Sequence, residues 1–183
     1  MHINVLVIVD AQNDFITGAL ANPIADERVP NIVNLIHDRK WDLIITTFDT
    51  HYNNYLDTRE GKNLPIPHCI YDTDGHNIDS RILEALQQQD CDPVIGLCKY
   101  TFGSKLLAGK IFNHFDLTPD DTLNIYFCGF CTDICVISNV LAVKMELPNI
   151  ADINVVANAC AGVTPESHEA ALTVMKSCQI NII

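Results

Sequence analysis

The chain has 183 residues, 48% of them hydrophobic and 19% charged, and its 11 basic and 23 acidic residues give a formal net charge of −12. This length suits one domain with a sizeable core rather than two, so we expect a single domain over residues 1–183. The negative charge argues against nucleic acid and anionic membrane surfaces as partners.

The N-terminal stretch has an apolar run that ends at Asp10, without the basic region and cleavage site of a signal peptide. The run is also far shorter than the ~20 residues that span a bilayer. These features predict a cytoplasmic protein whose eight cysteines are mostly free thiols rather than a disulfide framework.

Short apolar runs rich in Val and Ile alternate along the chain with segments of helical spacing. The runs have the length of strands and lack clean alternation, as strands buried on both faces do. They cover Ile3–Val9, Leu43–Phe48, Pro93–Cys98, Leu123–Cys128, Ile153–Ala157 and Gln179–Ile183. Helices are expected over Val29–Arg39, Ile78–Gln88, Ile134–Leu147 (ended by Pro148) and Pro165–Ser177. The pattern predicts the α/β class, a three-layer α/β/α fold with a mostly parallel sheet of about six strands.

The segment from His51 to about Asn77 interrupts this alternation. It has no sustained helical or strand period, and glycines and prolines punctuate it. Connections this long without secondary structure of their own are usually functional or disordered. Because tyrosines and aliphatic side chains are available to pack, we predict an ordered active-site loop.

The carboxyl ends of the predicted strands carry reactive side chains. The first strand runs into Asp10, the second into Asp49 with His51 close behind, the third into Lys99 and the fourth into the cysteine-rich stretch CGFCTDICV. Ligands of parallel α/β sheets bind at the carboxyl ends of the strands. We therefore expect a carboxylate, a pair of metal-ligand side chains, an amine and a thiol at one edge of the sheet.

Three interpretations of CGFCTDICV compete. Cys128 and Cys131 have the C-x-x-C spacing of redox pairs, but Cys128 ends a strand instead of opening a helix, which disfavours a redox role. A zinc knuckle lacks the second ligand pair that it needs. Thr132-Asp133 can cap a helix, which places Cys135 in the first turn, where free N–H groups favour a thiolate and can hold an oxyanion. We therefore favour a nucleophilic Cys135.

Three motifs resemble the isochorismatase-like cysteine hydrolase superfamily, and they occur in the same order along the chain. They are VDAQNDF at residues 9–15, Lys99 after the third strand, and GFCTDICV at residues 129–136. Two further segments, DTH at residues 49–51 and PIPHC at residues 65–69, resemble the metal-binding segments of its nicotinamidase branch. The similarity spans nearly the whole chain.

The resemblance implies a catalytic triad with Cys135 as the nucleophile, Asp10 as the proton acceptor and later donor, and Lys99 as the cation beside both. The implied activity is hydrolysis of a small, nicotinamide-like amide through a thioester on Cys135. It also implies an oxyanion hole formed by the backbone N–H groups of Cys131 and Cys135, with a cis peptide bond between Phe130 and Cys131.

The same resemblance implies a divalent metal held by Asp49, His51 and His68, with zinc as the first choice and iron or manganese as alternatives. Phe15 and Phe102 are candidate aromatic walls of the substrate site. The implied partners are a small-molecule amide substrate and further copies of the chain, because family resemblance favours a homo-oligomer.

The chain departs from the nicotinamidase pattern in three places. Residues 52–57 lack the additional histidine that some nicotinamidases carry, Pro65 stands where a tryptophan often sandwiches the pyridine ring, and Tyr100–Ser104 differs from an acidic, serine-rich stretch. The resemblance therefore supports the catalytic triad more strongly than it supports nicotinamide as the substrate.

Two other functions stay open at this point. One is metal-free, isochorismatase-like hydrolysis of another small substrate, such as a carbamoyl compound or a vinyl ether. The other is a thiol redox or sensor protein that uses Cys128 and Cys131. Elemental analysis separates the first from metal-assisted hydrolysis, and thiol titration under mild oxidant tests the second.

Overall fold

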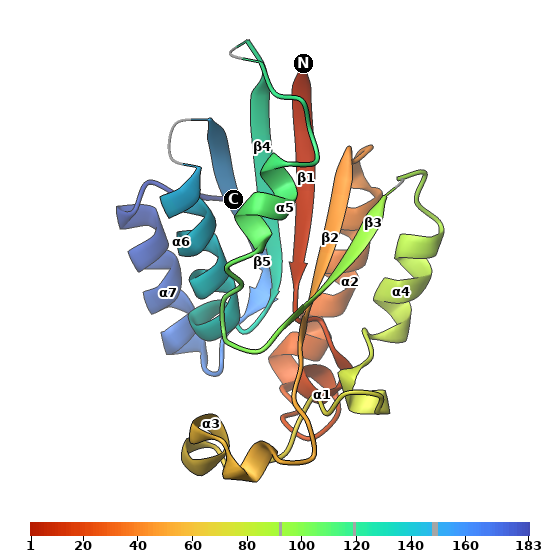
Figure 1. The fold of residues 1–183 in the computed structure, drawn as a ribbon, viewed down its shortest axis with the longest axis vertical. Coiled ribbons are helices and arrows are strands. Elements are labelled where there is room, and N and C mark those ends of the chain that lie inside the picture. Colours follow the sequence, from red (N-terminus) through yellow and green to blue (C-terminus); the bar gives the residue numbers. More distant parts are fainter. Residues whose placement is uncertain (92, 119, 148–149) are drawn as a thin grey trace.

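The computed structural model describes the chain except residues 92, 119 and 148–149, and its centre is a parallel sheet of six strands (Figure 1). The strands lie in the order β3-β2-β1-β4-β5-β6, and every neighbouring pair is parallel. Their bounds are β1 His2–Val9, β2 Leu43–Asp49, β3 Val94–Lys99, β4 Thr122–Phe130, β5 Ala151–Ala161 and β6 Asn181–Ile182. The predicted fold class is confirmed.

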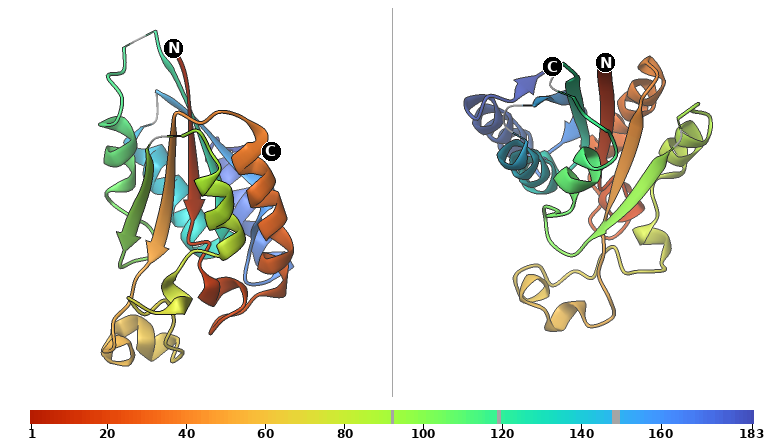
Figure 2. Two further views of the ribbon diagram at one scale, coloured as in Figure 1. Left: turned by 90° about the vertical axis from the view of Figure 1, so that its right-hand side faces the viewer. Right: turned by 45° about the horizontal axis from the view of Figure 1, so that its top comes forward.

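Helices cover both faces of this sheet, as the edge-on view in Figure 2 shows. From β1 the chain adds β2 and β3 on one side, and from β4 it adds β5 and β6 on the other, so right-handed crossovers place their helices on opposite faces. The long helices are α2 (Pro23–Asp38), α4 (Ser80–Gln87), α5 (Leu107–Phe112), α6 (Ile137–Glu146) and α7 (Pro165–Ser177). The short ones are α1 (Asn13–Ile16), η1 (Tyr55–Asp57), α3 (Arg59–Asn63), η2 (Asp74–His76) and the π-helical turn η3 (Thr132–Val136).

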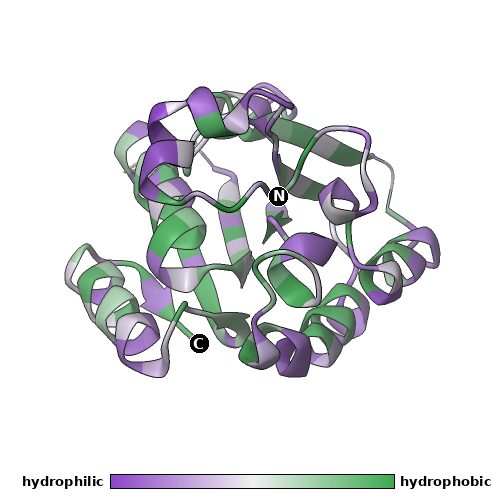
Figure 3. Ribbon diagram, turned by 90° about the horizontal axis from the view of Figure 1, so that it is seen from below, coloured by the Kyte–Doolittle hydropathy of each residue, from purple (hydrophilic) through white to green (hydrophobic). Residues whose placement is uncertain are grey.

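The core lies between the sheet and the helices. Residues 5–9 of β1 are all fully buried, which explains why the sequence of this strand shows no polar alternation. Figure 3, a view onto the carboxyl ends of the strands, shows hydrophobic residues concentrated in the sheet and hydrophilic residues in the peripheral segments. In the part of the chain that the structure describes, no helix has both the length and the apolar character needed to cross a bilayer.

Local sequence signals explain where the helices begin. Helix α7 has the predicted bounds, because Thr164 caps it in a capping box and Pro165 occupies the first turn. Helix α2 begins before the predicted Val29, because the side chain of Asn22 accepts hydrogen bonds from the N–H groups of the first turn. Pro148, which we expected to end the helix after β4, lies outside the described residues.

The helix that follows β4 begins differently from the prediction. Thr132 and Asp133 do not cap it: the Thr132 hydroxyl hydrogen-bonds His168 Nδ1 at 2.8 Å, and the Asp133 carboxylate accepts the N–H of Val163 at 3.1 Å. The predicted cap is wrong because both side chains instead join the turn η3 to the segment of β5 and α7. Cys135 nevertheless lies in the first turn, as predicted.

The segment between β2 and α4, which we call the excursion (residues 50–77), is ordered as predicted. It extends beyond the carboxyl ends of the strands and contains η1, α3 and η2 (Figure 1). Its two halves pair with each other, since the N–H of His51 donates to the carbonyl of Cys69 at 3.0 Å and the N–H of Tyr71 donates to the carbonyl of His51 at 2.8 Å. Tyr55 packs inside it, whereas Tyr52 is exposed.

Candidate active site and metal centre

The strand ends bring together the four reactive side chains that the sequence placed there. Asp10 directly follows β1, and Asp49 and Lys99 are the last residues of the neighbouring strands β2 and β3, paired in register. Cys135 follows β4 within η3. All four side chains are buried, so they interact in a region with little water to screen their charges.

Lys99 lies at the centre of this group. Its Nζ is 2.6 Å from Asp10 Oδ2, 3.4 Å from Asp49 Oδ1 and 3.6 Å from Cys135 Sγ. Burial by itself would lower the pKa of the Lys99 amine, but the negative charge of Asp10, with Cys135 and Asp49 nearby, raises the pKa above its ordinary value. Lys99 is therefore an ammonium ion that links two carboxylates and a sulfur atom.

Asp10 is oriented by Thr47 on the neighbouring strand. The Thr47 hydroxyl donates to Asp10 Oδ1 at 2.6 Å and accepts the backbone N–H of Asp10 at 3.1 Å. These bonds leave Oδ2 on the side of Lys99. Burial raises the pKa of the Asp10 carboxyl, which makes the carboxylate a stronger base than an exposed aspartate.

Cys135 is a thiol rather than a thiolate in this arrangement. Burial and the negative charge of Asp10 raise the pKa of the Cys135 thiol well above its ordinary value, and Lys99 opposes this shift without overcoming it. The predicted preference for a thiolate in the first helical turn is outweighed by this burial. The geometry suits transfer of the thiol proton to Asp10 as the sulfur attacks.

The turn η3 presents backbone N–H groups next to the thiol. The peptide bond between Phe130 and Cys131 is cis, as the resemblance implies. The N–H of Val136 donates to the carbonyl of Cys131 at 3.0 Å and closes the turn. Cys135 precedes this closing residue, so its N–H belongs to the set at a helix start that has no acceptor within the helix.

The redox interpretation of Cys128 and Cys131 finds little support in their surroundings. Cys128 is fully buried in β4, and burial raises the pKa of its thiol well above the ordinary value. Burial also raises the pKa of Cys131 to about 12. Thiols with such a raised pKa form little thiolate near neutral pH, and because the thiolate is the reactive species they exchange slowly with disulfides.

A second group of ligand-type side chains adjoins the first and shares Asp49 with it. Asp49 Oδ2 is 2.9 Å from His51 Nε2 and 3.3 Å from His68 Nε2. Glu60, from helix α3, approaches the same imidazoles, with Oε1 at 3.6 Å from His51 Nε2 and 4.0 Å from His68 Nε2. One ligand atom from each of these four residues lies within 4.8 Å of all the others.

The chemistry of this donor set fits a divalent transition metal. His68 Nδ1 is 2.8 Å from the carbonyl oxygen of Ile66, which can only accept, so Nδ1 carries a hydrogen. The other ring nitrogen, Nε2, faces Asp49 and can bind a metal ion once it gives up its own proton. Burial would raise the pKa of the Asp49 carboxyl, but hydrogen bonds from His51 and His68 lower it overall, so Asp49 is ionised. Two imidazoles and two carboxylates suit zinc, iron or manganese.

Glu60 was not among the predicted metal ligands. The family pattern pointed to a further histidine in residues 52–57, where this chain has none. Thr58 caps α3 through the N–H of Gly61, and the short helix then carries the Glu60 carboxylate to the imidazoles of the ligand set. The only available signal was a helix-capping threonine ahead of a glutamate inside an otherwise aperiodic segment.

A cavity of about 370 Å³ opens onto both groups. Its lining includes Cys131 and Cys135 as well as the metal-ligand types Asp49, Glu60 and His68. Its remaining walls are mainly apolar and include both aromatic residues that the sequence singled out; they are formed by Phe15, Leu20, Ala21, Asn22, Pro23, Leu64, Phe102, Ile134 and Val163. Phe102 lies half exposed, whereas Phe15 is buried with its ring edge-on to His68.

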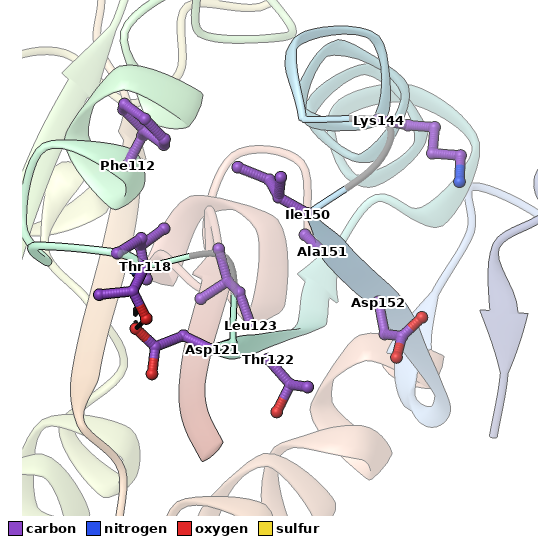
Figure 4. Close-up of a pocket in the computed structure, with 10 residues that line it drawn as sticks. Phe112, Thr118, Asp121, Thr122, Leu123, Lys144, Ile150, Ala151 and Asp152 are labelled. Carbon is purple, nitrogen blue, oxygen red and sulfur yellow. Dashed lines mark hydrogen bonds between the residues drawn. The ribbon is translucent and has the colours of Figure 1, made fainter. Parts of the chain in front are cut away.

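A larger cavity, of about 590 Å³, lies at the opposite end of the sheet, where β4 and β5 begin (Figure 4). Its Asp121 is already paired with the amino group of Met1 and accepts a hydrogen bond from Thr118 at 2.8 Å, and Lys144 points away from the other residues drawn. The residues described around it include neither cysteine nor histidine. The reactive chemistry is therefore at the smaller cavity.

Known proteins resemble this chain over nearly its whole length. The nicotinamidase of Schizosaccharomyces pombe is 25% identical over 214 residues, covering 97% of this chain and 91% of that protein. The structure of a pyrazinamidase of Pyrococcus horikoshii in complex with zinc is 27% identical, covers 98% of each chain and has a TM-score of 0.75. The yeast nicotinamidase structure, 18% identical with 99% of each chain covered, shares the fold with a TM-score of 0.79.

A family model identifies the family of this chain. The model of the isochorismatase domain matches residues 4–183, which is nearly the whole chain. The chain therefore belongs to the isochorismatase family, in its nicotinamidase-related branch.

Proposed function

We propose that this chain is a cysteine amidase that hydrolyses the C–N bond of a small, neutral carboxamide of the nicotinamide type. The observation that carries the proposal is the contact of Lys99 Nζ with both Asp10 Oδ2 at 2.6 Å and Cys135 Sγ at 3.6 Å, beside a cavity. A base, a cation and a nucleophile within one buried contact group are the parts that acyl transfer through a thiol requires.

In the proposed reaction, Asp10 takes the proton of Cys135 as the sulfur attacks the amide carbon. The oxygen that becomes negative turns toward the backbone N–H groups of Cys131 and Cys135. Asp10 then gives its proton to the leaving nitrogen, the C–N bond breaks, and ammonia departs from a thioester. Water attacks the thioester while Asp10 takes its proton, which releases the carboxylic acid and restores the thiol. Lys99 keeps Asp10 ionised until the transfer begins.

We also propose that Asp49, His51, Glu60 and His68 hold a divalent metal ion, with zinc as the first choice. Such an ion supplies Lewis acidity and a binding point for a ring nitrogen or water of the substrate complex. The support is the donor set itself, with two imidazoles and two carboxylates converging within 4.8 Å, and the zinc bound in the pyrazinamidase relative.

The charge of the cavity favours a neutral substrate over the dianions that isochorismatase-like chemistry can involve. Among its described lining residues are two carboxylates, Asp49 and Glu60, and no lysine or arginine. Recognition of a substrate carboxylate in proteins generally relies on arginine or lysine, and the free N–H groups at the start of η3 already have a role in this proposal as the site of the developing oxyanion. The apolar walls instead suit an aromatic ring.

Ammonia release from nicotinamide and a panel of small amides tests the proposal, with purified protein loaded with zinc. We expect turnover by the natural chain and a loss of at least about a thousandfold in Cys135→Ala, because the nucleophile cannot be replaced by binding alone. Cys98→Ala is the matched control, since Cys98 is exposed on β3, and should keep full activity. Equal ammonia release by Cys135→Ala would refute the thioester route.

A further inference from the structure

The side chain of Gln12 occupies a central place between the catalytic group and the ligand group without touching the cavity. Gln12 follows Asp10 at the start of the segment that leads into α1 and is fully buried. Its Oε1 accepts the backbone N–H of Asp49 at 2.7 Å, and its Nε2 donates to the carbonyl of Asp49 at 2.9 Å and to the carbonyl of His76 at 2.9 Å. Both amide hydrogens and the amide oxygen are therefore used.

The chemistry of the partners fixes the orientation of this amide. The two carbonyl oxygens can only accept, so they must face Nε2, and the N–H of Asp49 must face Oε1. A rotated Gln12 amide would set its oxygen against two carbonyl oxygens and its NH₂ group against an N–H. One side-chain conformation therefore satisfies all three bonds.

These hydrogen bonds take the place of backbone pairing between β1 and the end of β2, which the turn of the chain at Asp10 prevents. The pairing of β1 with β2 ends at Ile8 and Thr46, and the chain then turns at Asp10, whose φ is 45°. Strand β2 continues to Asp49, which pairs with Lys99 of β3 on its other side. The Gln12 amide offers one donor and one acceptor to Asp49, as the next residue of a strand would.

The Gln12 amide hydrogen-bonds to the backbone at both ends of the excursion. Asp49 immediately precedes the excursion and His76 nearly ends it, and both bond to Gln12. The ring of His76 adds a second link, with Nε2 at 3.0 Å from Thr50 Oγ1. The loop that carries Glu60 and His68 is thus held at one point of the sheet edge.

We infer that Gln12 is the positioning residue that sets the Asp49 carboxylate between the Lys99 ammonium and the ligand group by holding the backbone of Asp49 and the end of the excursion together. This inference rests on the proposed function for its link to metal binding. Its structural part stands independently, because the three Gln12 bonds exist whatever the protein hydrolyses. Mutation of residues that hydrogen-bond to metal ligands without touching the metal typically lowers metal affinity by about 10- to 100-fold.

The test compares Gln12→Met with a matched removal of a buried amide elsewhere. Asn154 of β5 also makes three side-chain hydrogen bonds, to the carbonyls of Ile125 and Asp152 and from Asn181, far from the cavity. Asn154→Leu therefore controls for the general cost of losing such an amide. Circular dichroism and thermal melts establish that both variants are folded under the conditions used.

Two measurements then decide the inference. In metal-free protein, hydrogen exchange of the peptide covering residues 47–51 should be at least tenfold faster in Gln12→Met than in the natural chain, and unchanged in Asn154→Leu. Titration with Co²⁺ should show an apparent Kd raised at least tenfold and an altered visible spectrum in Gln12→Met alone. Unchanged exchange at residues 47–51, or equal effects in both variants, overturns the inference.

Failure of the proposed function gives a different result. If the natural chain binds no Co²⁺ and releases no ammonia, the metal-assisted amidase falls, while the exchange experiment still judges the role of Gln12. A Gln12→Glu variant adds a conservative check, because it keeps the side-chain length but offers at most one hydrogen, from a protonated carboxyl, to the two carbonyls. We expect it to resemble Gln12→Met, and a natural Co²⁺ affinity in Gln12→Glu would contradict the inference.

Discussion

The hydroxyl of Thr47 tunes the pKa of Asp10, the proposed catalytic base. It is fully buried, and its bond to Asp10 Oδ1 at 2.6 Å stabilises the ionised carboxylate and so lowers the pKa of Asp10, against the raising effect of burial. In Thr47→Val this bond is lost and the pKa of Asp10 rises further. The acid limb of the pH profile of kcat/KM should therefore move to higher pH.

The size of this effect follows from the hydrogen bond. Hydrogen bonds to charged groups contribute about 1.5–3 kcal/mol. At pH values below the pKa of the acid limb, kcat/KM of Thr47→Val should therefore be about 10- to 100-fold lower than that of the natural chain. Thr46→Val is the control, because Thr46 is also buried on β2 but points to the opposite face of the sheet. A Thr47→Val profile that coincides with that of the natural chain would show that Asp10 is not the titrating base.

Glu60 offers a second prediction at this scale. Its carboxylate lies 3.6 Å from His51 Nε2 within the ligand group, so Glu60→Gln removes a negative charge and a donor oxygen without changing the size of the side chain. We expect zinc affinity, measured by competition with a chromophoric chelator, to fall about 10- to 100-fold. Asp57→Asn, an exposed carboxylate of the same excursion, should leave the affinity unchanged.

Residues differ in how far their roles could be predicted from the sequence. The positions of Asp10, Lys99 and Cys135 at one buried group were predictable because each follows an apolar strand and lies in a short motif; their catalytic roles stay a proposal. The roles of Thr47 and Glu60 were not, because each depends on a contact with a residue far away in the sequence. Thr47 reads locally as an ordinary strand residue, and nothing in the local pattern places it against Asp10.

The contact between η3 and α7 predicts how the stability of the folded chain depends on pH. His168 of α7 hydrogen-bonds Thr132 of η3, and burial lowers the pKa of the His168 imidazole below its ordinary value of 6.5. The unfolded chain therefore binds a proton at His168 more readily than the folded chain does. The stability that the neutral imidazole contributes is complete above pH 6.5 and is lost as the pH falls through the lower pKa of the folded state.

His168→Gln removes this titration. Between pH 7.5 and pH 5.5 the melting temperature of the natural chain should fall by a few degrees more than that of His168→Gln, as measured by differential scanning calorimetry. His114→Gln, at an exposed histidine after α5, should follow the natural chain across the same range. Parallel pH dependence in the natural chain and His168→Gln would place the titration elsewhere.

Elements were predictable where a period or a cap marks them. The six strands were predictable because each is a short Val- or Ile-rich run. Burial on both faces is correct for β1 and β2 but wrong for the edge strands β3 and β6, which are largely exposed because each has only one neighbouring strand. Helix α7 was bounded correctly by Thr164 and Pro165. The start of the helix after β4 was not, because Thr132 and Asp133 satisfy distant partners instead of the helix end. Short helices such as α3 gave no period long enough to recognise.

At the scale of the whole molecule, the order of the strands in the sheet determines which reactive side chains lie next to one another. The motifs predicted that an acid, an amine and a thiol share one edge, because parallel strands end together. The resemblance also implied that the excursion returns to this edge with His68, whereas the place of Glu60 beside Asp49 was not predicted, since it depends on the contacts of a closed loop. The homo-oligomer stays a prediction, for which sedimentation analysis of the purified chain is the direct measurement.

We expect the same closed loop to couple metal binding at the proposed site to folding. The ligands come from the end of β2, from α3 and from the loop after it, so the unfolded chain does not hold them together, and metal binding should stabilise the folded state. At zinc concentrations of about 100 Kd the stabilisation is about 2.7 kcal/mol, or roughly 5–10 °C in melting temperature for a chain of this size. Differential scanning fluorimetry in chelator and in zinc measures the shift.

The net charge of −12 provides an alternative explanation that this experiment must separate. Any cation screens repulsion among 23 acidic side chains, so a shift produced equally by magnesium or by an equivalent ionic strength of sodium chloride would reflect general screening. Coordination by imidazole favours zinc over magnesium, and His51→Ala should therefore lose most of the zinc shift while keeping any response to salt. A zinc shift that survives in His51→Ala would place the bound ions on the acidic surface and not at the ligand group.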